Sequence, residues 1–199
     1  MPRLFVGLTI PSEIQHYLLF AQGGVTHARW QSADQLHLTL RFIGDVDGRT
    51  ASDIETALDT ISFAPFDVYA EGVGVFGKVE RARSVWASVK PRAALTALHN
   101  KIDQALNYGA GLPPETRQYE PHITLARFSG RHGRLNSFLE SAGGLRTPPW
   151  QVDHFSLFLS TLGSTGAHYT VLGNFGGLDN PWALEDESFA EPEAAPFEL

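Results

Sequence analysis

The sequence predicts an α+β domain with mixed sheets, and not an all-parallel doubly wound fold. Short apolar strands alternate with amphipathic helices, and several neighbouring strands are joined by hairpins. In addition, the similar strands "LHLTLRF" and "PHITLARF" occupy comparable places in the two halves of the chain, which indicates a weak internal duplication. At 199 residues the chain is long enough for one compact body, or for two half-sized lobes that share a core.

The first half of the chain predicts three strands and two helices. We expect strands at 3–9, 28–30 and 36–43, and helices at 12–21 and 50–61. Ser12 and Gln15 have the spacing of a capping box at the start of the first helix. Gly44 closes the third strand. Ile54 begins an apolar i, i+3, i+4, i+7 series that predicts the second helix.

The second half predicts five strands and two helices. We expect strands at 66–75, 84–89, 121–128, 150–160 and 168–175, and helices at 93–107 and 135–141. The polar stretch "GKVERAR" separates the first two strands, and a Gly/Ser turn separates the last two. The apolar face of the longer helix consists of Leu95, Leu98, Ile102 and Leu106. We expect His99, beside Leu98, to be in solvent.

Charge and composition restrict the function. The net charge of -7 comes from residues 179–199, which hold seven acids and no Lys or Arg, so the body up to residue 178 is neutral. We expect one domain over 1–178 and a flexible acidic tail over 179–199. A neutral body argues against tracking along a nucleic-acid backbone but allows recognition of one terminal phosphate.

The expected location is the cytoplasm. The chain has no cysteine, so disulfides and thiolate chemistry are excluded. No apolar run reaches the roughly 20 residues that a membrane-spanning helix needs, and the first residues lack the pattern of a signal peptide. We therefore expect a soluble protein without a membrane partner.

The two repeated strands carry the candidate chemistry. Residues two apart in a strand share a face, so His37 lies with Thr39, and His122 lies with Thr124. If the strands meet, two imidazoles and two hydroxyls converge. With pKa values near 6.5, such a pair is suited to hold one protonated and one neutral member near neutral pH, as general acid–base catalysis requires. The hydroxyls can donate to phosphate oxygens.

A zinc site is the competing interpretation of paired histidines. The spacing H-E-x-x-H is absent, and neither motif contains a carboxylate that would complete a ligand set. We therefore expect neither a metal nor any other cofactor.

Two arginines and two aromatic residues are further candidates. Arg41 is four residues after His37 and should keep to the His/Thr face, where it would bind phosphate or form a structural ion pair. Arg127 is five residues after His122 and would point away in an ideal strand, although a bulge could bring it back. Phe42 and Tyr169 are candidates for stacking on a base, with core packing as the alternative.

On these motifs and their flanks, the chain resembles the 2H phosphoesterases, and most of all their RNA 2′,3′-cyclic phosphodiesterase (LigT-like) branch. The resemblance covers about residues 3 to 175 and includes "ARW", "LHLTLRFIGDV", "VWASV" and "PHITLARF". It implies a bilobal α+β body with pseudo-twofold symmetry, a cleft between the lobes and helices outside. The acidic tail has no counterpart in the pattern.

The resemblance also implies an activity. It implies hydrolysis of a terminal 2′,3′-cyclic phosphate on RNA to a 2′-phosphate, with His37 as the proton donor to the 3′ oxygen and His122 as the base. Thr39, Thr124 and Arg127 would hold the phosphate. Two alternatives stay open, a 2′-5′ RNA ligase that uses the same residues and a catalytically idle RNA-binding module of the same fold. We expect a monomer whose partner is an RNA end.

Overall fold

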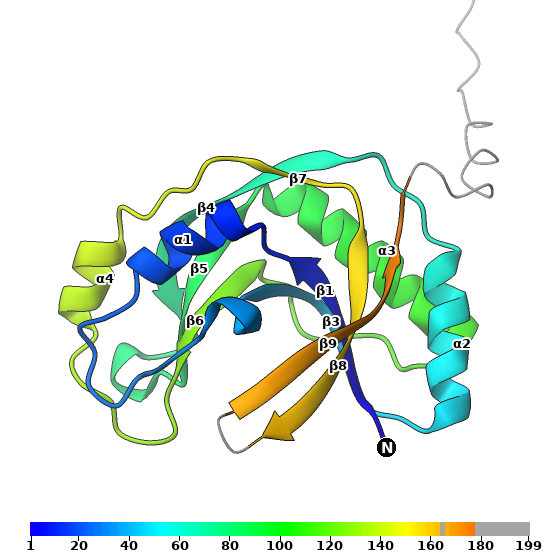
Figure 1. Ribbon diagram of the computed structural model, residues 1–199, viewed down its shortest axis with the longest axis horizontal. Helices are drawn as coiled ribbons and strands as arrows, with labels where there is room; N and C mark the ends of the chain where they lie inside the picture. Colours follow the sequence, from blue (N-terminus) through cyan, green and yellow to red (C-terminus); the bar gives the residue numbers. More distant parts are fainter. Residues whose placement is uncertain (164–165, 178–199) are drawn as a thin grey trace, which may run out of the picture.

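The computed structural model describes residues 1–163 and 166–177 (Figure 1). The strands are β1 (Arg3–Thr9), β2 (Arg29–Trp30), β3 (His37–Asp45), β4 (Phe66–Val75), β5 (Ser84–Lys90), β6 (His122–Arg127), β7 (Trp150–Val152), β8 (Phe155–Gly163) and β9 (Gly166–Phe175). The α-helices are α1 (Ser12–Phe20), α2 (Gly48–Asp59), α3 (Arg92–Ala110) and α4 (Asn136–Ala142), and two short 3₁₀ helices span Ala33–Gln35 and Val79–Arg81. The acidic segment expected at 179–199 lies outside the described residues.

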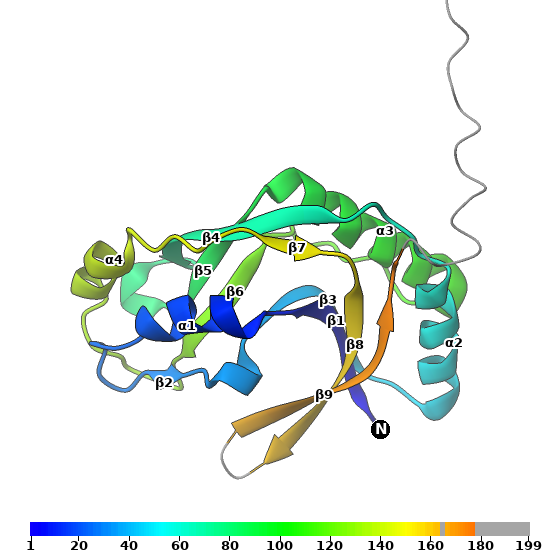
Figure 2. The same ribbon diagram turned by 45° about the horizontal axis from the view of Figure 1, so that its top comes forward.

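The strands form one curved sheet in the order β7-β4-β5-β6-β3-β1-β8-β9, with β2 added beside β6 (Figures 1 and 2). All the strand pairings within the described residues are antiparallel. The expected α+β class is therefore confirmed, whereas the parallel pairs of a mixed sheet do not occur in this part of the chain.

The order divides the sheet into two half-sheets of four strands, β7-β4-β5-β6 and β3-β1-β8-β9. They meet at β3 and β6, which pair through Leu38 and Ile123. Both side chains are fully buried, so this pair also connects the cores of the two halves. This is the bilobal arrangement that the resemblance to the 2H phosphoesterases implies.

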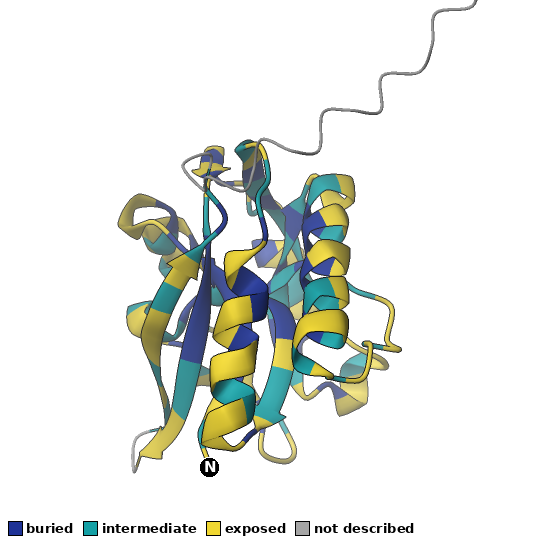
Figure 3. Cartoon of the chain, turned by 90° about the vertical axis from the view of Figure 1, so that its right-hand side faces the viewer, coloured by how far each residue is buried: buried dark blue, intermediate teal, exposed yellow. Residues whose placement is uncertain are grey.

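The helices cover the sheet. α3 packs on β3, β5 and α2, so it spans the junction between the half-sheets. α1 and α4 lie at one end of the molecule and α2 lies at the other (Figures 1 and 2). α2 turns Ile54, Ala57 and Leu58 inward and its polar residues outward (Figure 3). None of the described helices is long and apolar enough to cross a membrane.

The region predicted as one strand at 150–160 is two strands in opposite halves of the sheet. β7 pairs with β4, and β8 pairs with β1. The break falls at Asp153 and His154, which are not buried and whose side chains contact each other at 2.6 Å between Oδ1 and Nδ1. The chain crosses here from one half-sheet to the other, which a local apolar pattern does not reveal.

The predicted capping box of α1 is also wrong. Pro11 is the residue before the helix, and no side chain caps the first turn. The amide of Gln15 reaches past it and donates to the carbonyl of Ile10 at 3.0 Å. Proline has a fixed φ that suits this position, so the helix can begin without a hydroxyl cap.

β1 and β3 approach each other closely at Gly7. A Cβ atom at this position would lie 2.7 Å from the carbonyl oxygen of Leu38, which is backbone and cannot rotate away. Gly7 pairs with Thr39 at the point where the register of β3 shifts by one residue. A residue without a side chain is therefore required here.

We expect Gly7→Ala to lower the free energy of unfolding by about 1 to 3 kcal/mol, the usual cost of overpacking a well-packed interior. Gly48→Ala is the matched control, because a Cβ at Gly48 would meet nothing within 4 Å. Urea unfolding of both variants measures the difference. Equal stability of the two variants would contradict this account of the β1–β3 contact.

Candidate active site

The two motif histidines occupy equivalent positions in the two half-sheets. His37 begins β3 and His122 begins β6, and both side chains are half-buried. The Nδ1 atom of His37 lies 2.8 Å from the carbonyl oxygen of Gln35, and that of His122 lies 2.7 Å from the carbonyl oxygen of Glu120. A carbonyl oxygen only accepts, so Nδ1 donates in both cases, and Nε2 of each neutral ring is left to exchange a proton.

The two carbonyl groups are themselves held in place. The amide of Gln35 donates to the carbonyl of Ala167 on β9 at 2.9 Å. The carboxylate of Glu120 accepts hydrogen bonds from both terminal nitrogens of Arg92 at the start of α3. Each imidazole is therefore oriented by a backbone group that is tied to another element of the fold.

The pairing of β3 with β6 brings the threonines to the histidines. With Leu38 opposite Ile123, the same antiparallel register sets His37 opposite Thr124 and Thr39 opposite His122. All four side chains are half-buried, while Leu38 and Ile123 are buried on the other face. The four motif residues therefore share one face of the sheet at the junction of its halves.

A β-bulge follows each motif at the same place. Leu40 is the extra residue of β3 against β1, and Leu125 is the extra residue of β6 against β5. After a bulge the side-chain alternation shifts by one position. Arg127 and its counterpart Phe42 are thereby returned to the His/Thr side and exposed, as the proposed bulge for Arg127 required.

The bulge in β3 places Arg41 differently from the sequence expectation. Its side chain is 9% exposed and turned away from the His/Thr face, and its Nε donates to Asp103 of α3 at 2.6 Å. The other nitrogens reach the carbonyls of Phe42 and Pro113 and the carboxylate of Glu115. These contacts occupy the guanidinium, which favours the structural ion pair over phosphate binding.

Aromatic rings surround both histidines. His37 contacts Phe5 at a centroid distance of 4.8 Å and Tyr169 at 4.7 Å, the latter edge-on. His122 contacts Phe76 edge-on at 4.9 Å and Trp86 at 5.8 Å. Tyr169, which the sequence suggested as a candidate for stacking on a base, therefore lies beside a motif histidine.

Burial among these rings changes the proton affinity of both imidazoles. Desolvation is the largest cause that lowers the pKa of His37 from 6.5 to about 4, and the charges of Arg127 and His122 lower it further. Desolvation also lowers the pKa of His122, again with a contribution from Arg127. Both rings are therefore mainly neutral in the free protein near pH 7, so the expected mixed protonation needs a further source of negative charge.

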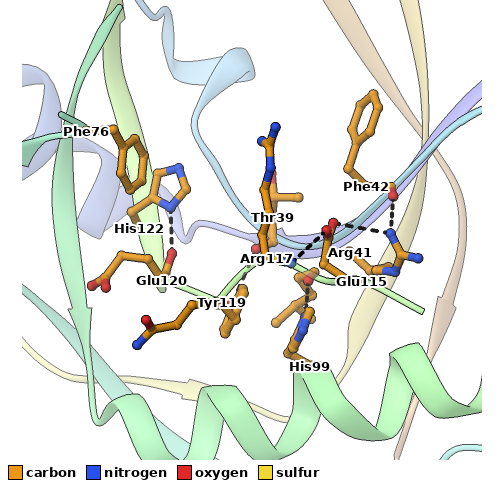
Figure 4. Close-up of a pocket in the computed structure, with 12 residues that line it drawn as sticks. Thr39, Arg41, Phe42, Phe76, His99, Glu115, Arg117, Tyr119, Glu120 and His122 are labelled. Atoms are coloured by element: carbon orange, nitrogen blue, oxygen red, sulfur yellow. Dashed lines mark hydrogen bonds and ion pairs between the residues drawn. The ribbon is translucent and has the colours of Figure 1, made fainter. Parts of the chain in front are cut away.

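A pocket of about 430 Å³ opens beside His122 and Thr39. Figure 4 shows His122 and Phe76 on one side of it, Phe42 on the other and Thr39 between them. Phe42 is 47% exposed and Phe76 is 46% exposed. The two aromatic side chains give this pocket apolar walls that suit a flat ring.

His99 is buried and not in solvent, which contradicts the sequence expectation. Its Nδ1 donates to the carbonyl of Leu40 at 2.7 Å, and its ring stacks on Tyr119 at 4.2 Å. The hydroxyl of Tyr119 donates to the carbonyl of Thr39 at 3.2 Å. These side chains hold the bulge of β3. The sequence does contain a signal for this burial, because His99 is four residues after Leu95 and three before Ile102 and so lies on the apolar face of α3.

The described residues include no group of three or more His, Cys, Asp or Glu side chains that could bind a metal ion. His37 and His122 were the candidate zinc ligands in the sequence, and Nδ1 of each donates a hydrogen bond to a backbone carbonyl. Their arrangement suits proton transfer at Nε2.

A two-lobed antiparallel sheet whose halves join through two His-x-Thr-x strands is the fold of the two-histidine phosphoesterases. The family model of the 2′-5′ RNA ligase superfamily matches residues 21–163, and the chain belongs to this superfamily.

Curated relatives agree with this assignment. An RNA 2′,3′-cyclic phosphodiesterase of Aeropyrum pernix is 32% identical over 142 residues, which is 70% of this chain and 80% of the relative. One of Archaeoglobus fulgidus is 28% identical over 176 residues, which is 87% of this chain and 99% of the relative.

Solved structures share the fold. The structure of E. coli LigT complexed with 3′-AMP has 26% identity and a TM-score of 0.68, and the match covers 88% of this chain and 98% of that one. A protein of Thermus thermophilus with 24% identity has a TM-score of 0.72 over 87% of this chain and 96% of that one.

We expect Arg41→Met to lower the free energy of unfolding by about 3 kcal/mol, because it leaves the carboxylate of Asp103, which is only 16% exposed, without its charged partner. Adding Asp103→Asn should recover part of this loss. Urea unfolding measures both effects. An Arg41→Met protein of unchanged stability whose KM for substrate rises sharply would instead support the phosphate-binding role.

Proposed function

We propose that the protein is an RNA 2′,3′-cyclic phosphodiesterase that hydrolyses a terminal cyclic phosphate to a 2′-phosphomonoester. The observation that carries the proposal is the matched orientation of His37 and His122, each with Nδ1 bound to a carbonyl two residues earlier and Nε2 without a hydrogen-bond partner in the described part of the chain. A binding module has no need for two oriented proton carriers, so this observation also weighs against the idle RNA-binding alternative.

The proposed reaction is an in-line displacement. Nε2 of His122 takes a proton from a water molecule whose oxygen attacks the phosphorus. The bond between phosphorus and the 3′ oxygen breaks, and Nε2 of His37 gives its proton to that oxygen. The products are a 2′-phosphate and a 3′-hydroxyl, and exchange with solvent restores the two imidazoles.

The negative charge of the bound substrate favours the protonated form of His37, the proposed acid. The pKa of His37 in the free protein, about 4, leaves it mostly neutral near pH 7. A cyclic phosphate brings one negative charge beside the ring and offsets the charge of Arg127, and both effects raise the pKa of the imidazole. Proton uptake by the site therefore accompanies binding of the anion.

The other candidates have supporting roles. The hydroxyls of Thr39 and Thr124 donate to the phosphate oxygens, and Arg127 stabilises their charge. Phe42 lines the pocket beside His122 and would contact the terminal base there, and Tyr169 lies against His37 and would contact the substrate on that side. One chain contributes all these residues, so the proposed active form is a monomer acting on RNA ends without a metal or other cofactor.

The names of the curated relatives support the hydrolase over the ligase. A 2′-5′ RNA ligase would use the same residues with a 5′-hydroxyl in place of water, so the two reactions are distinguished by the product. The relatives from Aeropyrum pernix and Archaeoglobus fulgidus are both named for the phosphodiesterase activity.

We expect the pure protein to convert a short oligonucleotide ending in a 2′,3′-cyclic phosphate to the 2′-phosphate product in the presence of EDTA. His37→Ala and His122→Ala should each lower kcat by at least about 10², the usual contribution of a positioned acid or base. Their combination should cost much less than the product of the single effects. Chromatography and phosphatase treatment identify the product end.

His16→Gln is the matched control, because His16 is exposed on α1 and should leave kcat unchanged. A substrate with a better leaving group at the 3′ position should rescue His37→Ala selectively. Rescue of His122→Ala instead would reverse the assignment of acid and base. Full activity in both alanine variants would overturn the mechanism, and ligation to an added 5′-hydroxyl oligonucleotide as the main reaction would favour the ligase.

The lowered pKa values predict different pH profiles for kcat/KM and kcat. The profile of kcat/KM reports the free enzyme, in which burial lowers the pKa of both histidines. The profile of kcat reports the complex, in which the phosphate raises the pKa of the acid. The limb at which activity falls with rising pH should therefore lie about 1 pH unit or more higher for kcat. Coincident limbs would contradict the proposed role of the anion.

A further inference from the structure

Two arginines lie side by side on the edge of the candidate site. Arg29 of β2 pairs directly with Arg127 of β6, so their side chains leave the sheet on the same face. Both are exposed. Like charges in directly opposed positions destabilise a strand pair, which means that the free protein holds this arrangement at a cost.

No carboxylate offsets these charges within residues 1–163 and 166–177. Arg41, Arg92, Arg146 and Lys90 all have acidic partners in this part of the chain. Neither Arg29 nor Arg127 has an ion pair or a side-chain hydrogen bond there. Two adjacent guanidinium groups are therefore available to an anionic ligand.

The two arginines line a pocket of about 600 Å³ on the His37 side of the site. Its other described walls are Gln31, Gln35, Tyr169 and the tip of the β8–β9 hairpin, which contributes Leu162, Gly163, Gly166 and Ala167. Gln35 links the pocket to the site, because its carbonyl orients His37 while its amide is bound to Ala167. The pocket therefore continues from the place where the terminal phosphate is expected.

The positions of the two arginines differ with respect to the histidines. Arg127 lies on the His/Thr face after the bulge of β6, and its charge helps to lower the pKa of both His37 and His122, so the terminal phosphate of the proposed reaction would lie within its reach. Arg29 lies on β2, which pairs with β6 on the same side as β3 and beyond the His37 end of that strand, and paired strands are about 4.8 Å apart. In an RNA chain with a cyclic phosphate at its 3′ end, the next negative charge is the phosphodiester on the 5′ side of the terminal nucleoside.

We propose that Arg29 binds this penultimate phosphodiester, so that the enzyme prefers the end of an RNA chain to a cyclic mononucleotide. The inference rests on the proposed function, because the terminal phosphate sets the reference point. In this proposal Arg29 contributes to the preference for RNA over a mononucleotide, and it takes no part in the proton transfers of the two histidines.

The test compares two substrates, a nucleoside 2′,3′-cyclic monophosphate and a trinucleotide ending in the same group. Arg29→Gln should lower kcat/KM about tenfold for the trinucleotide, which corresponds to one charged contact, and less than about twofold for the mononucleotide. Arg29→Lys should retain most of the activity on the trinucleotide. The slope of log kcat/KM against log salt should fall by about 0.7 for this substrate, the value for one phosphate contact on a single strand.

Arg49→Gln is the matched control. Arg49 is exposed in the first turn of α2, at the end of the molecule away from β2 (Figure 2), and its loss should change neither substrate. Equal losses on both substrates for Arg29→Gln would place Arg29 at the terminal phosphate and overturn the proposal. Unchanged turnover of the trinucleotide would overturn it as well.

A binding measurement separates this inference from the proposed function. A labelled trinucleotide ending in a 2′-phosphate should bind to the wild-type protein, and Arg29→Gln should weaken the binding about tenfold. If the wild-type protein binds it through Arg29 but hydrolyses neither cyclic substrate, the proposed function fails and the Arg29 site stands. If Arg29→Gln binds it as tightly as the wild type, the Arg29 site fails.

Discussion

The pairing of Leu38 with Ile123 is the contact on which the site depends. It joins β3 to β6 and thereby the two half-sheets. Because both side chains are buried, the neighbouring residues of each strand must face the other side. One buried pair thus sets which residues meet across the junction. A slip of one residue in this register would turn the histidines and threonines into the core, so selection for a buried core also preserves the site.

The two bulges show how the duplicated halves have acquired different tasks. Equivalent positions after the bulges hold Phe42 in one half and Arg127 in the other, both on the side of the histidines. The positions just before them hold Arg41 and Ala126, both buried. The same backbone device therefore presents a base-sized apolar surface in one half and a phosphate-sized charge in the other. The buried arginine is stabilised by Asp103 of α3.

Much of the fold followed from local patterns, and the remainder needed tertiary information. The strands at 3–9 and 66–75 were predicted with the observed bounds, because each is a continuous run with clear ends. The side of the sheet that holds His37 and His122 followed from strand alternation. The direction of Arg41 could not follow, since alternation fails at a bulge. The burial of His99 follows from Leu95 and Ile102, its neighbours on the helix face, and not from the residue beside it in sequence.

The electrostatics of the site are unfavourable in the free protein and favourable with an anion. Burial lowers the pKa of both histidines, and Arg127 lowers it further. Arg29 adds a second charge beside Arg127. In the proposed reaction, a bound phosphate would offset both arginines and raise the proton affinity of the imidazoles at once. Binding of the anion and arrival of the catalytic proton are then one linked event. A neutral ligand of the same shape would leave the acid unprotonated, so the linkage itself selects for phosphate.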